Sequence, residues 1–411
     1  MNRFSPFREC LPTKARSAGA PVPLTSRLPQ FVGVRFAVQT VLIGLRVILI
    51  GVGSVGMRIA EHFARLQVAE LWLIDPRHCK PESLLTHPIS RMTHLPKAGY
   101  TARLCKQINR ATRVFYFVGS VEELPLDSFA DAHLCVMATD NLAAEIEVGR
   151  RCLSLGKRLV QASLHGETLT AQVRTFGNAD AEGPCPACAF SALEWQQLAE
   201  QVSYSCDGSQ GGIPLRSLVS TLPTRSTSHL CSLAADLALN QSLRLALGFG
   251  EPVADTILEY CGFTNRTVTS RLERNPTCRC DHTRFEVVRA AMPLRAHSMA
   301  KLLETFFRDE AAELITVTVG RSDWIEQGRC RCADLVPVRR FVTAGTSSIG
   351  HCRRCKEAIH TQPFGTYQTV SASLLRNVDL LSLAKLGVRQ CPWVLLRGRQ
   401  KAILVQDPLR T

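Results

Sequence analysis

Cysteines at metal-ligand spacing are the residues of this chain whose types most directly imply chemistry. Cys185-Pro-Ala-Cys188 has a reach that suits two corners of a zinc tetrahedron. Cys278-Arg-Cys280 can supply the other two corners, with His282 nearby as a further candidate ligand. A redox C-x-x-C is the alternative, but that motif normally opens a helix after the first strand of a thioredoxin-like unit, which is not its position here. The pattern therefore predicts a zinc site.

A second and more compact quartet lies closer to the C-terminus. It consists of Cys330-Arg-Cys332 and Cys352-Arg-Arg-Cys355. The alternative is that four thiols fall at this spacing by chance. Paired cysteines separated by a short interval are typical of a zinc ribbon, so we predict a second, separate zinc site.

A glycine-rich turn follows the first strongly apolar run of the chain. Gly51, Gly53 and Gly56 come directly after Val47-Ile48-Leu49-Ile50 and open a stretch with helical spacing. Glycines at such a point let backbone N–H groups approach an anion at a helix N-terminus. Asp75 closes the next apolar run, where an acid can bond ribose hydroxyls. The alternative is that the glycines only tighten a strand-to-helix turn; together with Asp75, they predict a bound nucleotide.

Charged residues follow at points that could serve the same nucleotide. Asp140-Asn141 comes after the fourth apolar run, at the carboxyl edge of a sheet where open α/β proteins bind ligands. Asp140 could cap the next helix, or its carboxylate could hold Mg²⁺ against phosphates. Arg91 and Lys97 lie after Asp75 and could clamp a triphosphate, although solvated surface charge is the default for any single cation.

Strand-like and helical segments alternate around these residues. The strand-like runs are Val47–Ile50, Leu71–Ile74, Val114–Val118, Leu134–Met137 and Arg158–Ala162, and helical spacing recurs over Ala98–Asn109, Ser226–Leu247 and Met299–Arg308. This alternation is typical of an α/β fold with a doubly wound, Rossmann-like parallel sheet. We expect an N-terminal arm (1–45), a nucleotide-binding domain with a zinc knuckle (46–283) and a C-terminal zinc-ribbon domain (284–411).

The composition is that of an ordinary globular protein. The 411 residues are 45% hydrophobic and 20% charged, which argues against disordered, collagen-like and coiled-coil classes. A net charge of +14 predicts acidic partners, among them nucleic acid, nucleotide phosphates and acidic protein surfaces. The first 45 residues lack a signal-peptide pattern and no apolar run is long enough to cross a bilayer, so we expect a cytoplasmic protein with no membrane partner.

Taken together, the motifs resemble the ThiF/MoeB superfamily of adenylyltransferases, which includes ubiquitin-activating enzymes, over about residues 45–283. The resemblance is carried by the glycine turn, Asp75, Asp140-Asn141, Cys185-Pro-Ala-Cys188 and Arg274-Asn-Pro-Thr-Cys278. It implies a homodimer that uses ATP and Mg²⁺ to adenylate the C-terminal glycine of a ubiquitin-like or sulfur-carrier protein, with release of pyrophosphate.

The resemblance also implies a role for each residue of this chain that matches a family motif. The resemblance assigns the nucleotide to Gly51, Gly53, Gly56 and Asn141, the ribose to Asp75, the phosphates to Arg91 and Lys97, the magnesium to Asp140, and zinc to Cys185, Cys188, Cys278 and Cys280. This chain departs from the family where Ser83-Leu-Leu-Thr-His87 replaces Asn-Leu-x-Arg-Gln/His, so that Arg91 is only a substitute for the family arginine. The second zinc pair is C-x-C, which leaves the fourth ligand open between Cys280 and His282.

Cys206 differs from the remaining cysteines because it lies in a polar, glycine-rich segment between the zinc knuckle and the long helix. Exposure and mobility in such a segment suit a nucleophile. In the superfamily, this crossover segment bears the cysteine that takes the activated carboxyl terminus as a thioester. The alternative is a free loop thiol, since many adenylation steps need no cysteine.

Three classes of function compete. The first is the adenylating enzyme just described. The second is a nicotinamide-dependent oxidoreductase, which the glycine turn alone would favour but which needs neither Asp140-Asn141 nor a zinc knuckle. A zinc-ribbon nucleic-acid binder fits the +14 charge, but the arginines are spread along the whole chain, so nucleic acid is not the expected partner. Residues 284–411 show no rhodanese-like loop, and we expect them to dock a carrier or a conjugating enzyme, which favours ubiquitin-like activation.

Overall fold

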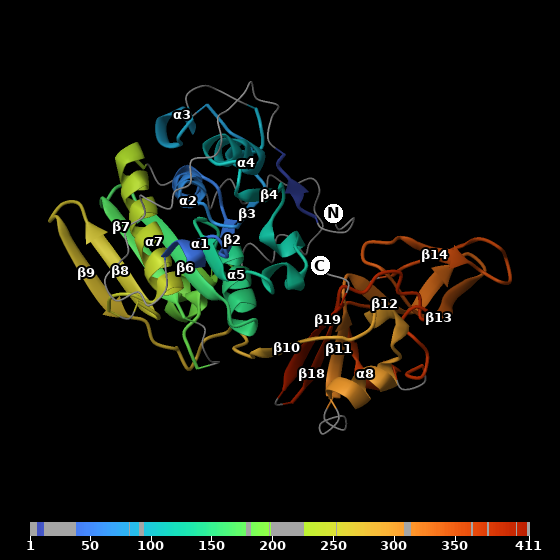
Figure 1. Ribbon diagram of the computed structural model, residues 1–411. Helices are drawn as coiled ribbons and strands as arrows, with labels where there is room; N and C mark the ends of the chain where they lie inside the picture. Colours follow the sequence, from blue (N-terminus) through green and yellow to red (C-terminus); the bar gives the residue numbers. More distant parts are fainter. Residues whose placement is uncertain are drawn as a thin grey trace. The chain divides into compact units, whose positions relative to one another are not determined.

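The computed structural model of the chain describes residues 6–11, 38–81, 83–89, 94–177, 182–196, 198, 226–251, 253–307, 314–362, 365–375, 378–399 and 401–408. Packing divides the chain into a first unit, residues 3–282, and a second unit, residues 283–411 (Figure 1).

Within the described residues, the first unit is built on a nine-stranded sheet in the order β1-β4-β3-β2-β5-β6-β7-β8-β9. Its strands are β1 (Arg8–Glu9), β2 (Arg46–Ile50), β3 (Glu70–Ile74), β4 (Arg113–Phe117), β5 (Leu134–Met137), β6 (Arg158–His165), β7 (Thr170–Phe176), β8 (Thr256–Cys261) and β9 (Arg266–Arg271). The strands from β4 to β6 run parallel, and the outer strands are antiparallel. The sheet is therefore mixed, because a short turn between β6 and β7 can join only antiparallel neighbours.

The strand order contains one reversal that positions the site. From β2 the chain moves outward to β3 and β4, and it then returns to the other side of β2 to form β5. The reversal between β2 and β5 is a topological switch point, where open α/β sheets bind ligands at the carboxyl ends of the strands.

Helices fill the spaces above and below this sheet. They are α1 (Val38–Leu42), α2 (Ser54–Arg65), α3 (Ser83–Thr86), α4 (Lys97–Ile108), α5 (Leu142–Ser154) and α7 (Ser228–Leu247), with 3-10 turns at Val121–Glu123 (η2), Leu126–Phe129 (η3) and Pro186–Ala189 (η4). α2 packs beside both α4 and α7 (Figure 1). These three helices share one large core with β2 and β3, whereas α5 packs against η4 in a separate cluster with the zinc-knuckle cysteines.

Part of the predicted N-terminal arm belongs to this unit. β1 pairs with β4, and the Phe7 ring lies 4.7 Å from the Trp72 ring, centroid to centroid. Phe7 and Cys10 are both buried. Residues 6–11 therefore extend the sheet at its edge, which differs from a loosely docked arm.

The second unit is built on a ten-stranded sheet within the described residues. Its strands are β10 (Phe285–Arg289), β11 (Leu314–Val319), β12 (Ser322–Cys330), β13 (Ala333–Thr343), β14 (Ser348–His351), β15 (Ala358–His360), β16 (Thr366–Tyr367), β17 (Thr369–Ser371), β18 (Trp393–Gly398) and β19 (Ala402–Gln406), and its helices are η6 (Leu294–Ala296), α8 (Met299–Phe306) and α9 (Ala372–Leu375). Trp324 and Phe341, with ring centroids 5.0 Å apart, pack in the main core of this unit. A smaller cluster gathers around Cys330 and Cys352.

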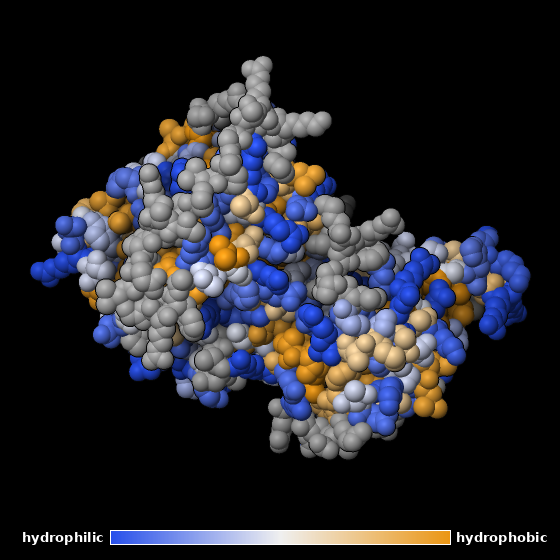
Figure 2. Space-filling model, in the orientation of Figure 1, coloured by the Kyte–Doolittle hydropathy of each residue, from blue (hydrophilic) through white to orange (hydrophobic). Residues whose placement is uncertain are grey.

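The surface drawn in Figure 2 mixes hydrophilic and hydrophobic residues over both units. Among the described helices, none is both long and apolar enough to cross a membrane.

Candidate functional site

The glycine turn lies at the switch point, between the carboxyl end of β2 and the start of α2. Gly51 has φ +80°, and a Cβ there would lie 2.5 Å from the carbonyl oxygen of Ala138 at the end of β5. A Cβ on Gly56 would lie 2.0 Å from the Gly51 carbonyl oxygen. These two glycines are thus required by close backbone packing. Gly53 is not crowded in this way, since a Cβ there would meet only the His87 side chain, at 4.0 Å.

Two polar atoms near this turn lack a hydrogen-bond partner among the described residues. Nε2 of His87 is buried and unpaired, and so is one terminal nitrogen of Arg58, which projects from α2. The rest of the Arg58 guanidinium donates to the hydroxyls of Ser228 and Ser232 on α7, at 2.6 and 2.7 Å. A buried donor or acceptor without a partner costs free energy, so an open cradle at Gly53 with two such atoms fits a polar ligand.

Asp75, at the end of β3, faces the turn with 6% of its surface exposed. Its carboxylate accepts hydrogen bonds from the backbone N–H of Val52 at 2.9 Å and of Arg77 at 2.8 Å. Burial raises the pKa of Asp75 above its usual value, while these N–H groups and the charge of Lys97 oppose the shift. The acid therefore fixes the glycine turn in addition to the role expected toward a ribose.

Asp140 and Asn141 follow β5 and have separate roles. Asn141 caps α5, because its side-chain oxygen accepts a hydrogen bond from the Ala144 N–H at 3.1 Å. Asp140 is therefore not the cap, and its side chain is 75% exposed. A nitrogen of the Arg77 guanidinium lies 3.9 Å from its carboxylate, so a carboxylate and a cation meet at this edge of the sheet.

The predicted phosphate-binding cations differ in what the structure describes. Lys97 opens α4, and its charge acts on both Asp75 and His87. Burial lowers the pKa of His87 to about 4, with Lys97 and Arg58 contributing, so its imidazole is neutral near pH 7. Arg91 lies outside the described residues, as does the predicted nucleophile Cys206.

The first cysteine cluster gathers beside α5. The Cys185 sulfur lies 3.8 Å from the sulfurs of both Cys188 and Cys278, and the Cys188 sulfur lies 3.6 Å from Nε2 of His282. A zinc–sulfur bond of about 2.3 Å places sulfurs about 3.8 Å apart in a tetrahedral site. The ligand atoms of these four residues all lie within 4.8 Å of one another. Cys280, which the sequence left open beside His282 as the fourth ligand, packs against the same cluster but is not in that group.

The second cluster brings together the four cysteines predicted for the zinc ribbon. Cys330 ends β12, and its sulfur lies 3.7 Å from that of Cys332 and 3.1 Å from that of Cys355. The Cys332 and Cys352 sulfurs are 3.6 Å apart. Four thiols at these separations suit a structural zinc ion.

Three residues at the candidate nucleotide site were not found from the sequence. They are Arg58, Arg77 and His87. His87 stands where the family motif ends in Gln or His, so that position was a usable signal. Arg58 and Arg77 gave no signal, because an isolated arginine in a sequence is a surface residue by default.

Comparison with known proteins identifies the first unit. Residues 26–280 match the ThiF family. No curated protein matches the chain. Among solved structures, the chain is similar to a crystal structure of E. coli MccB with ATP, at 15% identity and TM-score 0.47, over 59% of this chain and 69% of that chain. It is also similar to a crystal structure of PaaA, at 15% identity and TM-score 0.44, over 57% and 75%.

Proposed function

The chain belongs to the ThiF family and is a ThiF-type adenylyltransferase; on this premise, we propose that its substrate is the C-terminal glycine of a ubiquitin-like protein and its nucleotide ATP. The observation that carries the proposal is the open cradle at Gly53, with Asp75, Asp140 and unpaired buried polar atoms around it. Because the chain is an adenylyltransferase, the alternative function of a nicotinamide-dependent oxidoreductase is excluded.

The proposed reaction has one bond formed and one broken. The C-terminal carboxylate of the ubiquitin-like protein attacks the α-phosphorus of ATP, and the bond to the bridging oxygen breaks, which releases pyrophosphate and leaves an acyl adenylate. Most of the catalysis in such a displacement comes from positioning and from stabilising charge on the phosphates.

Different residues at the switch point position the nucleotide and stabilise charge on its phosphates. Backbone N–H groups of the glycine turn, at the N-terminus of α2, face the phosphates, and Asp75 bonds the ribose. Asp140 holds Mg²⁺, which neutralises phosphate charge. Lys97 and Arg91 are the predicted phosphate cations, and Arg77 joins them because its guanidinium already faces the Asp140 carboxylate. Neutral His87 donates or accepts a hydrogen bond through Nε2.

A second step follows in the proposal. The Cys206 thiolate attacks the carbonyl carbon of the acyl adenylate, forms a thioester and releases AMP, after which a conjugating enzyme takes the acyl group. The alternative is a sulfur-carrier adenylyltransferase that forms no thioester.

The proposal also includes structural zinc in the two cysteine clusters and a homodimeric enzyme.

An ATP–pyrophosphate exchange assay tests the first step. We expect exchange that requires Mg²⁺ and a ubiquitin-like protein with a C-terminal glycine. The matched control is the same protein without its terminal glycine, which should give none. Equal exchange with and without the terminal glycine would show that this glycine is not the substrate. If neither ubiquitin-like nor sulfur-carrier proteins support exchange, the proposed adenylation reaction is wrong.

A further inference from the structure

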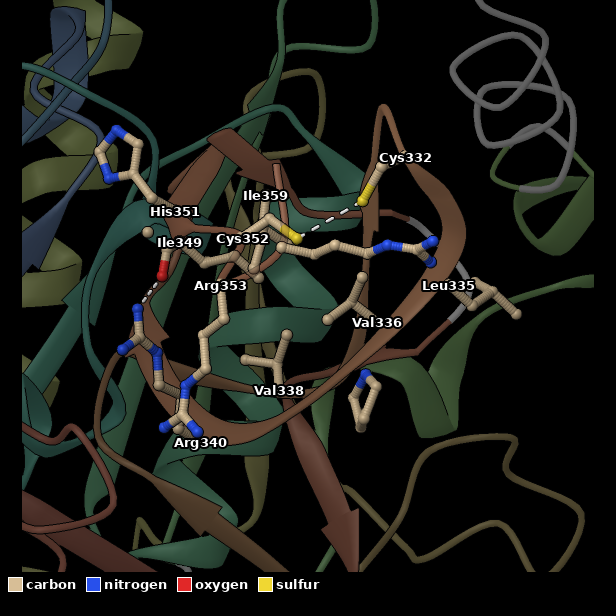
Figure 3. Close-up of a pocket in the computed structure, with 13 residues that line it drawn as sticks. Cys332, Leu335, Val336, Val338, Arg340, Ile349, His351, Cys352, Arg353 and Ile359 are labelled. Carbon is tan, nitrogen blue, oxygen red and sulfur yellow. Dashed lines mark hydrogen bonds between the residues drawn. The ribbon is translucent and has the colours of Figure 1, made fainter. Parts of the chain in front are cut away.

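A groove of about 680 Å³ lies in the second unit between β13 and β14. Figure 3 shows Cys332 and Cys352 on one side of it and Arg340 on the other, with Val336 and Val338 between them. The guanidinium of Arg340 donates a hydrogen bond to the carbonyl oxygen of Ile349, which links the two strands. The volume falls within the range of about 300–1,000 Å³ that is usual for ligand sites.

Both strands beside the groove are edges. Among the described strands, β13 pairs only with β12, and β14 pairs only with β15. Because β12 also pairs with β15, the two edges are the ends of one ribbon in the order β13-β12-β15-β14. Edge strands present backbone N–H and C=O groups with which an extended chain can pair. The groove is therefore open to a partner in extended conformation.

The positive charge of the groove favours an acidic partner. Arg340, Arg353 and Arg354 line it together with His351, and no carboxylate is among the lining residues that the structure describes. Arg353 and Arg354 are exposed, so their guanidinium groups are accessible. A guanidinium binds a carboxylate through two parallel hydrogen bonds, which makes arginine the usual partner of acidic groups. The end of the second unit where β13 and β14 lie is mainly hydrophilic on the face drawn in Figure 2.

The remaining lining is aliphatic. Val336, Val338 and Ile349 contribute to it, and so does Leu335, which is 57% exposed. Among the described residues that line the groove, none is phenylalanine, tyrosine or tryptophan. Proteins that bind single-stranded nucleic acid stack bases on aromatic rings, so this lining favours aliphatic side chains of a peptide over bases.

We propose that this groove binds an extended acidic segment of a partner protein, with its carboxylates against the arginines and its aliphatic side chains against the valines and Leu335. The proposal does not rest on adenylation, because the groove lies in the second unit and its binding can be measured without nucleotide.

The test uses a fluorescein-labelled peptide of alternating glutamate and valine, and fluorescence anisotropy with the full-length, zinc-loaded protein. We expect saturable binding of this peptide and none of the matched lysine–valine peptide. A labelled oligouridylate is the third probe. Tighter binding of oligouridylate, or no saturable binding of the glutamate–valine peptide, would overturn the proposal.

Matched variants then locate the binding. Arg354→Glu should weaken it by about tenfold, since charge reversal turns attraction into repulsion. Leu335→Ser should weaken it by about fivefold through loss of apolar contact. Arg389→Glu and Leu380→Ser change the same residue types at exposed positions outside the groove and should leave binding unchanged. Zinc content checks that Arg354→Glu keeps the cysteine cluster. Equal loss in the groove and control variants would overturn the assignment.

Discussion

The carboxylate of Asp75 accepts a hydrogen bond from the backbone N–H of Val52 at 2.9 Å, which ties the end of β3 to the middle of the glycine turn. The same carboxylate also accepts from the Arg77 N–H. One buried acid thus holds the turn in place and presents Arg77 beside Asp140. The shape of the candidate nucleotide site depends on this acid even before any ligand binds.

Asp75→Asn should destabilise the protein. An amide has one acceptor oxygen, so one of the N–H groups of Val52 and Arg77 would lose its partner. Leaving a buried donor unpaired costs about 1–3 kcal/mol. Urea unfolding should show this loss, and Asp131→Asn, at an exposed acid, is the matched control. An unchanged unfolding midpoint in Asp75→Asn would argue against the role in holding the turn.

Asp140→Ala should remove adenylation without loss of stability. The side chain is mostly exposed, and Asn141 rather than Asp140 caps α5, so no packing is lost. Loss of a metal carboxylate removes charge stabilisation of several kcal/mol, and the exchange rate should fall by about two to three orders of magnitude. Wild-type exchange in Asp140→Ala would exclude the magnesium role. Asp131→Ala serves as the control.

The zinc content of two variants decides the fourth ligand of the first cluster. Wild-type protein should hold two zinc ions per chain, one in each cluster. Because His282 lies within 4.8 Å of three cysteine sulfurs, His282→Ala should lose one zinc ion and much stability, whereas Cys280→Ser should keep both. Metal analysis of the purified proteins measures this. The reverse result would make Cys280 the ligand.

Glu145 should make stability depend on pH. It lies in the first turn of α5, is 9% exposed, and burial raises its pKa to about 7. A raised pKa means that the folded state favours the protonated acid, so stability falls as pH rises from about 4.5 through about 7. Glu145→Gln should therefore be more stable than wild type by about 3 kcal/mol at about pH 8 and by about 1 kcal/mol at about pH 5.

Urea unfolding of wild type and Glu145→Gln over this pH range tests the prediction. Glu167→Gln removes an exposed carboxylate and should follow the wild-type profile. A stability difference between wild type and Glu145→Gln that does not grow with pH would show that the acid is ionised in the folded protein.

Cys206→Ala should separate the two steps of the proposed reaction. The acyl adenylate should still form, whereas a thiol-sensitive adduct with the ubiquitin-like protein should appear on non-reducing gels only with wild type. A folding defect would depress both steps. An adduct that persists in Cys206→Ala would move the role to another thiol, and no adduct in either form would favour adenylation alone.

Strands β2 and β5 could be predicted because each contains a continuous apolar run that is buried on both faces. The predicted bounds of β5 are those of the structure, and those of β2 differ by one residue. The outer strands could not be predicted in this way. Every residue of β9 is exposed, so its sequence has no apolar pattern, and the two residues of β1 depend on pairing with the distant β4.

In the candidate site too, features set by neighbouring residues in the sequence could be predicted, whereas those that depend on tertiary contacts could not. The cysteine groups were predicted because ligand spacing is local, whereas whether His282 or Cys280 is the fourth ligand depends on where each side chain points after a turn. The Arg58 side chain is held by its hydrogen bonds to α7, which form only when α2 packs on that helix, and no sequence pattern predicts this contact. The roles of all the predicted site residues stay predictions, and Arg91 and Cys206 also lie outside the described residues.

The pairing of β10 with β19 has a consequence for engineering the second unit. These two strands run parallel and side by side from Phe285 with Ala402 to Arg289 with Gln406, although they lie near opposite ends of that unit's sequence. Among the described strands, β10 pairs only with β19, whereas β19 also pairs with β18, so a truncation that removes β19 would also release β10. Because parallel neighbours start at the same edge of a sheet, a circular permutation of this unit would need a crossover linker from β19 back to β10, since a tight turn joins only antiparallel strands.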